Sequence, residues 1–166
     1  VSISQQTLIN EPANNSNNTP VAGDEIIPGF QNTLITIPIA NLLANDTDLD
    51  GDSLTIIAVN NAADGTVTLD DNGTKEDSSD DTIIFTPNEG FSGSTKFEYT
   101  VSDNQNETDI ASVTVIIPNN INGTNEDDNL VGSDSKDIIR GLKGDDTLEG
   151  FAGDDILKGG KGKDQL

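Results

Sequence analysis

Apolar and polar residues alternate along residues 21–118, and turn-forming residues interrupt the alternation at short intervals. A period of two residues places the apolar side chains on one face of a strand, so each run predicts a half-buried strand. About seven such runs in roughly 100 residues predict an all-β fold, an antiparallel sandwich. The clearest apolar positions are Leu54, Ile56 and Ala58; Val67 and Leu69; Ile83 and Phe85; Phe97, Tyr99 and Val101; and Ala111, Val113 and Val115.

The alternation ends near Asn119, where glycine becomes periodic. Residues 1–20 are dominated by Asn, Ser, Thr and Gln, and they carry too little apolar surface to order themselves. We therefore expect a flexible linker (1–20), a β-sandwich (21–118) and a C-terminal repeat (119–166). Within the sandwich, "DNGTKEDSSDD" at residues 71–81 predicts an exposed hairpin loop.

The repeat consists of nine-residue phrases that start at Gly123: "GTNEDDNLV", "GSDSKDIIR", "GLKGDDTLE", "GFAGDDILK" and "GGKGKDQL". Each phrase has glycine first, aspartate sixth and leucine or isoleucine eighth. The residues at these positions are Gly123, Gly132, Gly141, Gly150 and Gly159; Asp128, Asp137, Asp146, Asp155 and Asp164; and Leu130, Ile139, Leu148, Leu157 and Leu166.

Glycine and aspartate at these spacings suit a hard cation. Glycine at the first and fourth positions is expected to allow backbone angles that other residues resist, and to bring carbonyl oxygens close to an ion. Aspartate adds a carboxylate, and oxygen ligands in a flexible turn favour calcium over zinc. The candidate ligands are therefore the five sixth-position aspartates together with the backbone carbonyls of Gly141, Gly144, Gly150, Gly153, Gly159 and Gly162.

Residues 123–166 resemble the RTX, or hemolysin-type, calcium-binding nonapeptide repeats, whose pattern is G-G-x-G-x-D-x-U-x. The resemblance implies a parallel β-roll in which two phrases complete one coil and each ion lies between successive turns on the same side. It implies a best-formed site between the Gly141 and Gly159 turns, then one between Gly132 and Gly150. We expect the site between Gly123 and Gly141 to be the least well formed; Glu126 replaces the fourth-position glycine of its first turn, as Ser135 does in the Gly132 turn.

Two other interpretations of the repeat are a disordered Gly/Asp-rich tail and a metal-free solenoid. Disorder does not require a fixed aliphatic residue at the eighth position, so the pattern favours a folded roll. Its stacked carboxylates repel one another, and we expect that the roll does not fold without calcium.

A second acidic segment, "LLANDTDLDGDSLTI" at residues 42–56, places four aspartates at alternate positions. It is similar to an EF-hand loop, but the twelfth residue is Ile57 instead of glutamate and no helices are expected to flank it. Two interpretations remain: an Asx-rich turn that exposes charge, or a calcium site that relieves the repulsion. The four aspartates are Asp46, Asp48, Asp50 and Asp52.

This segment, together with "FTPNEGFSGSTKFEYTVSD" and "ASVTVII", resembles bacterial cadherin-like repeats of the tandem-95 or VCBS kind. The resemblance implies an immunoglobulin-like sandwich that often holds calcium at one end. It makes Asp46, Asp48 and Asp50 candidate ligands, with Asp103 as a further one. The chain departs from the family after Asp103, where "NQNE" replaces glycine-rich residues.

The composition excludes several classes of function. The chain has 30 acidic and 8 basic residues, a formal net charge of -22 and no histidine or cysteine. Such a polyanion is repelled by nucleic acid and anionic membranes, and without histidine or cysteine it cannot assemble the usual nucleophile-and-base sites. No apolar run approaches the roughly 18 residues of a membrane span. The start at Val1 and the end at Leu166, in mid-phrase, suggest a part of a longer protein.

These features predict a non-enzymatic, calcium-binding structural or adhesive module of a secreted or cell-surface bacterial protein. The resemblance to RTX proteins implies type I secretion, followed by folding and stiffening in extracellular calcium. Expected partners are calcium ions, neighbouring domains and extracellular surface ligands. The alternative is a non-catalytic C-terminal region of an extracellular enzyme, for example a metallopeptidase or another hydrolase, whose catalytic domain lies outside these residues.

Overall fold

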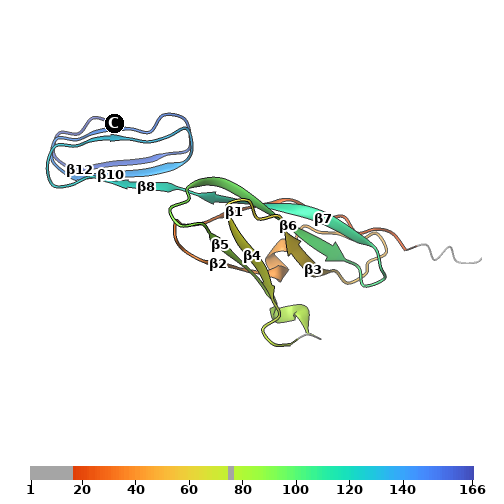
Figure 1. Cartoon of the computed structure of the whole chain (residues 1–166). Coiled ribbons are helices and arrows are strands. Elements are labelled where there is room, and N and C mark those ends of the chain that lie inside the picture. Colours follow the sequence, from red (N-terminus) through yellow and green to blue (C-terminus); the bar gives the residue numbers. More distant parts are fainter. Residues whose placement is uncertain (1–16, 75–76) are drawn as a thin grey trace, which may run out of the picture.

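The computed structural model describes residues 17–74 and 77–166, which form two consecutive all-β parts joined end to end (Figure 1). The first part has seven strands, as the alternation predicted, and the all-β fold is confirmed. Its elements are β1 (Glu25–Pro28), β2 (Ile35–Pro38), α1 (Ile39–Leu42), β3 (Thr55–Asn60), β4 (Gly65–Asp70), η1 (Ser78–Asp80), β5 (Thr82–Pro87), β6 (Gly93–Ser102) and β7 (Thr108–Ile117).

The seven strands form two sheets, in the orders β1-β7-β6-β3 and β2-β5-β4. Their pairs are antiparallel except for β1 and β7, which run parallel with Glu25 opposite Val113 and Pro28 opposite Ile116. The chain passes from one sheet to the other between β1 and β2, so β1 and the distant strand β7 become neighbours (Figure 1).

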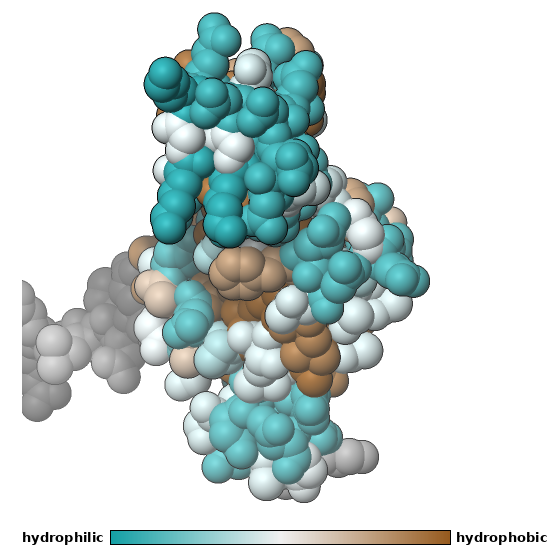
Figure 2. All heavy atoms as spheres, turned by 90° about the vertical axis from the view of Figure 1, so that its left-hand side faces the viewer, coloured by the Kyte–Doolittle hydropathy of each residue, from teal (hydrophilic) through white to brown (hydrophobic). Residues whose placement is uncertain are grey.

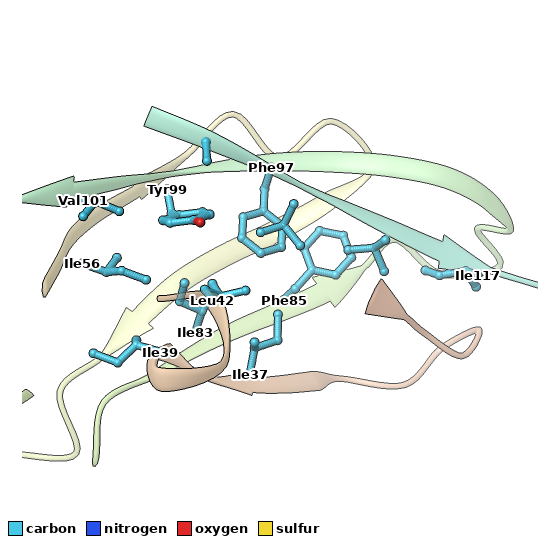
Figure 3. Close-up of a cluster of buried hydrophobic side chains, with 13 residues drawn as sticks. Ile37, Ile39, Leu42, Ile56, Ile83, Phe85, Phe97, Tyr99, Val101 and Ile117 are labelled. Atoms are coloured by element: carbon cyan, nitrogen blue, oxygen red, sulfur yellow. The ribbon is translucent and has the colours of Figure 1, made fainter. Parts of the chain in front are cut away.

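The core lies between the two sheets and uses the predicted apolar positions except Ala58 (Figure 3). A register shift after Ile56 breaks the alternation there, and Val59 packs against the core instead. The rings of Phe85 on β5 and Phe97 on β6 stack with their centroids 5.7 Å apart. Tyr99 and Val101 continue the inward row of β6 and are fully buried. Strand β6 therefore has a clear inner face because its period-two pattern matches the pleat of the sheet.

The segment 71–81 connects β4 to β5, and Asp70 pairs with Thr82, so the predicted hairpin is present. It contains the short helix η1, and its last residue differs from the predicted exposure. Asp81 is only 8% exposed and its Oδ1 atom has no hydrogen-bond partner among the described residues. The polar sequence of the loop could not indicate that Asp81 is buried, because the burial arises only where the loop joins β5.

The C-terminal part contains two parallel sheets, β8-β10-β12 and β9-β11. Partner residues are 18 positions apart, as in Ile139 with Leu157 and Leu130 with Leu148, so two nine-residue phrases complete each coil. Ile139 and Leu148 are buried between the sheets, whereas Leu166 at the last coil is 67% exposed. The strands are β8 (Asn119–Asn122), β9 (Asn129–Val131), β10 (Asp137–Lys143), β11 (Thr147–Glu149) and β12 (Ile156–Lys161).

Strand β8 lies before the first phrase that the nine-residue count detects. It pairs with β10, and Ile121 lies opposite Ile139 while Asn119 lies opposite Asp137. Only Pro118 separates β8 from β7. The nine-residue repeat did not reveal β8, because no glycine turn precedes this strand. Instead, strand β7 of the sandwich leads directly into it.

Candidate metal centre

The turns of the roll stack against turns 18 residues away. A Cβ built on Gly144 would lie 2.3 Å from the carbonyl oxygen of Glu126, and one on Gly162 would lie 1.9 Å from that of Gly144. The backbone angle φ is 115° at Gly144 and 148° at Gly162. Fourth-position glycine is therefore needed both for its left-handed backbone and for the close approach of a carbonyl.

Glycine at the first position meets only one of the two expectations: a Cβ on Gly141 would lie 2.6 Å from the carbonyl oxygen of Gly159, so glycine does allow a carbonyl to come close. None of the first-position glycines is among the residues with positive φ, so unusual backbone angles do not explain them. A Cβ on Gly141 would lie 2.2 Å from Oδ2 of Asp146, and one on Gly150 would lie 2.4 Å from Oδ2 of Asp155. The first-position glycine leaves space for the carboxylate of its own phrase.

Each of these carboxylates also reaches the preceding turn on its side of the roll. The backbone N–H of Asp128 donates to Oδ1 of Asp146 at 3.0 Å. The N–H of Asp137 donates to Oδ1 of Asp155 at 2.9 Å, and that of Asp146 to Oδ1 of Asp164 at 3.2 Å. The structure thus brings together all three predicted pairs of turns.

Two carboxylate oxygens in these turns are buried without a hydrogen-bond partner among the described residues. They are Oδ1 of Asp137 and Oδ2 of Asp146, on residues that are 0% and 1% exposed. A buried, unpartnered carboxylate oxygen is costly, and a cation removes that cost. Closely packed carboxylate and carbonyl oxygens in glycine turns are the donor set that calcium prefers, so these residues fit the ion.

Thr124 and Ser133 occupy second positions that the repeat pattern assigns to glycine, and they donate hydrogen bonds to the aspartate of their own phrase. The N–H of Thr124 lies 2.7 Å from Oδ2 of Asp128, and that of Ser133 lies 2.6 Å from Oδ2 of Asp137; both hydroxyls also donate. The repeat pattern has glycine at both positions and gives these two residues no role. Their hydroxyl groups were the signal that could have identified them as partners of the carboxylates.

In the sandwich, the carboxylates of Asp48, Asp50 and Asp52 lie within 4.8 Å of one another. Oδ2 of Asp48 is buried without a partner among the described residues. The backbone N–H of Asn18 donates to Asp50 at 2.6 Å. The side chain of Gln105 donates to Asp52 at 2.6 Å, and Asp52 was not among the candidate ligands. The alternation of the four aspartates was the signal that could have included it.

Asp103 and Asp46 lie outside that carboxylate group. Asp103 is 2% exposed, and it accepts hydrogen bonds from the N–H of Gln105 at 2.7 Å and from the side chain of Asn17. Burial acts to raise the pKa of Asp103, but these hydrogen bonds outweigh burial and the pKa is lowered. Asp46 instead accepts from the N–H of Gly23 at 2.7 Å.

Asp46 shares the hydroxyl of Tyr99 with Glu25, at 3.2 Å from each carboxylate. Burial raises the pKa of Glu25 to about 7, and the nearby negative charge of Asp46 adds to the effect. Burial also raises the pKa of Asp46. The structure therefore separates the predicted sandwich ligands into three neighbouring environments.

Two protein families match the chain. Residues 17–116 match the bacterial Ig domain, and residues 118–142 and 131–166 match the RTX calcium-binding nonapeptide repeat, described as four copies. The suspected arrangement, an immunoglobulin-like sandwich followed by RTX repeats, is thereby confirmed. No curated protein matches the chain.

Several solved structures match the chain at low similarity. A nucleoside hydrolase-related hypothetical protein from Saccharophagus degradans is 17% identical, with a TM-score of 0.42, over 61% of this chain and 26% of the other. The endo-fucoidan hydrolase MfFcnA9 is 21% identical, with a TM-score of 0.33, over 69% of this chain and 18% of the other. The chain thus spans about a quarter or less of these proteins.

Proposed function

Because residues 17–116 belong to the bacterial Ig domain family and residues 118–166 are RTX calcium-binding repeats, we propose that this calcium-binding module acts as an adhesive element outside the cell. Both families are structural, non-catalytic modules that typically occur in extracellular or secreted proteins. No helix among the described residues is long and apolar enough to cross a membrane.

The observation that carries this proposal is the pair of buried, unpartnered carboxylate oxygens on Asp137 and Asp146. In low intracellular calcium, repulsion between stacked carboxylates keeps the repeat open and suited to type I export. Extracellular calcium then fills the turns and stiffens the roll. The proposed ligands in the roll are the five sixth-position aspartates and the carbonyl oxygens of the first- and fourth-position glycines that the sequence identifies.

We propose a further calcium ion in the sandwich, held by the group of Asp48, Asp50 and Asp52. The buried free oxygen of Asp48 supports it, since a cation offsets both that burial and the repulsion within the group. Asp46 and Asp103 become ligands only if they exchange their present hydrogen bonds for the ion.

Calcium titration of the full chain, followed by far-UV circular dichroism, tests the proposal. The strand signal is expected to increase as calcium is added, because the roll orders on binding. Unchanged spectra in calcium and in chelator would count against a calcium-dependent roll.

Asp146→Asn tests the ligand role in the Gly141 and Gly159 turns. The amide keeps the size of the side chain but removes the charge, so the calcium concentration at the folding midpoint is expected to rise about tenfold or more. Asp134→Asn removes the same charge from an exposed position of the roll and should leave the midpoint nearly unchanged. Equal midpoints for the two variants would contradict the role of Asp146.

The alternative function, a non-catalytic region of an extracellular enzyme, makes the same calcium predictions for these residues. The two functions differ in the domains that would accompany these residues. Many further sandwich copies in the longer protein would favour adhesion, whereas a catalytic signature would favour the enzyme.

A further inference from the structure

Four of the eight basic residues of this acidic chain lie on one sheet of the roll. Arg140 and Lys158 lie opposite each other on the neighbouring strands β10 and β12, and Lys143 lies opposite Lys161. Ile139 and Leu157 point into the roll, so Arg140 and Lys158 point outward. Lys143 and Lys161 are exposed where the same strands end. We call these four residues the basic ladder.

Such a ladder is unfavourable within the protein itself. Like charges directly opposite one another on neighbouring strands repel, and strands in a sheet are only about 4.8 Å apart. Arg140 contacts the amide oxygen of Asn122 at 3.5 Å, which is a neutral partner. The corresponding outward positions on the other sheet, Val131 and Glu149, carry no positive charge. The repulsion would be relieved by a partner that places negative charge along β10 and β12.

An apolar hollow adjoins this sheet at the junction of the two parts. It has a volume of about 610 Å³, and Ile26, Pro28 and Phe30 line it on the sandwich side. On the roll side it reaches Ile138, which is two residues before Arg140 and therefore on the same outward face. Ile26 and Phe30 are 72% and 62% exposed. Figure 2 shows this apolar area directly beneath the hydrophilic roll.

We propose that the basic ladder and the apolar hollow together bind a linear acidic polysaccharide. Its anionic groups would pair with charges that repeat from strand to strand, and the C–H faces of its sugar rings would pack on Phe30 and Ile26. Asp154 also lines the hollow and opposes an anionic ligand. The inference deepens the proposed adhesive function, because it names the partner of the folded roll.

The charge of the whole chain favours a narrow polyanion over a broad anionic surface. At a net charge of -22 the molecule is repelled by a bilayer or a DNA duplex, which would face many acidic side chains at once. A single polysaccharide chain is narrow enough to follow the ladder and meets Asp154 at the hollow. Acidic side chains more than about 8 Å away are largely screened at physiological salt.

Binding of dextran sulfate to the full chain in saturating calcium, measured by calorimetry, tests the inference, with neutral dextran of equal length as the comparison. Dextran sulfate is expected to bind and neutral dextran is not. DNA duplex and vesicles with anionic lipid are measured in the same buffer. Absence of dextran sulfate binding, or equal binding of DNA or vesicles, would overturn the proposal.

Single-charge variants locate the site. Lys158→Gln is expected to weaken dextran sulfate binding about fivefold, the size expected for one exposed ion pair. Lys96→Gln removes an exposed charge from β6 and should leave binding unchanged. Asp154→Asn should strengthen binding. If Lys96→Gln weakened binding as much as Lys158→Gln, the attraction would be non-specific and the proposal wrong.

The apolar part is tested with Phe30→Ser, which should weaken dextran sulfate binding but leave binding of polyglutamate, a polyanion without sugar rings, unchanged. Equal effects on both ligands would exclude the hollow from the site. Circular dichroism of every sample separates the two proposals. A roll that stays unfolded in calcium refutes the calcium-dependent function, whereas a folded roll without binding refutes the polysaccharide site alone.

Discussion

Leu142 and Phe151 stand at second positions of the repeat and have a left-handed backbone, which favours glycine. Their φ angles are 80° and 63°, while Gly160 at the same position has 110°. A side chain in this left-handed region costs roughly 1–2 kcal/mol. Both side chains are largely exposed, at 46% and 59%, so packing recovers little of that cost.

Phe151→Gly is therefore expected to stabilise the roll. Glycine removes the roughly 1–2 kcal/mol cost of a side chain in the left-handed region. This gain exceeds the roughly 0.5–1 kcal/mol that glycine costs by giving the unfolded chain more conformational freedom. Thermal unfolding in calcium should show a higher melting temperature for the roll. Val131→Gly, at an exposed strand position without positive φ, should lower it; a shift in the same direction for both variants would contradict the strain.

Glu25 predicts a pH dependence of the sandwich. The hydroxyl of Tyr99 has one proton but lies within 3.2 Å of three acceptors, the carbonyl of Gly23 and the carboxylates of Glu25 and Asp46. A protonated Glu25 supplies a second proton to this group, in agreement with the rise of its pKa from 4.5 to about 7 through burial.

Between pH 4.5 and about 7 the folded protein binds more protons at Glu25 than the unfolded chain does. The free energy of unfolding from this group therefore falls as the pH rises through that window and is constant above it. Glu25→Gln, which resembles the protonated form, should flatten this part of the curve in thermal melts recorded with chelator. The exposed Glu89→Gln should retain the slope of the parent, and an unaltered slope in Glu25→Gln would refute the assignment.

The individual roles in the roll were only partly predictable. The spacing alone located the aspartates and glycines, because a nine-residue period is visible in one dimension. It could not show that Gly141 is required by the carboxylate of Asp146, since that contact depends on how the turn closes. The same limit applies to Asp46, which the sequence groups with Asp48 and Asp50 but which contacts Tyr99 and Gly23 in space.

Strand β10 is the central element of the roll, because it pairs with β8 on one side and β12 on the other. Its residue Ile139 is fully buried. The fixed aliphatic residue at the eighth place of the phrase marks this position in the sequence. The sequence does not mark the partner strand β8, which lacks the glycine turn that makes the other phrases recognisable.

Ile139→Ala should destabilise the roll by about 3 kcal/mol, since it leaves a cavity at the centre of the sheet. More calcium is then needed to fold the roll, and the midpoint of a calcium titration measures this. Ile156→Ala changes the same residue type at a position that is 41% exposed, and its midpoint should move much less. Equal shifts would indicate that β10 has no central role.

The two parts of the molecule have separate cores, and one residue reports on the sandwich alone. Tyr99 is the only tyrosine, the chain has no tryptophan, and Tyr99 is buried between the sheets of the sandwich. The alternating pattern predicted this core well, because burial on one face of a strand is a local property.

Removal of calcium should therefore affect the two parts differently. With chelator, the far-UV circular dichroism signal of the roll is expected to disappear, whereas tyrosine fluorescence should still show the thermal unfolding of an intact sandwich. Simultaneous loss of both signals on adding chelator would contradict independent cores.

The parallel pairing of β1 with β7 determines how the sandwich responds to mechanical force. Glu25 to Pro28 are matched in order with Val113 to Ile116, and β7 continues through Pro118 into the roll. A pull on the two ends of the chain loads the hydrogen bonds between these strands in shear, so they must rupture together instead of unzipping one at a time. Tensile strength therefore resides in this short pair of strands.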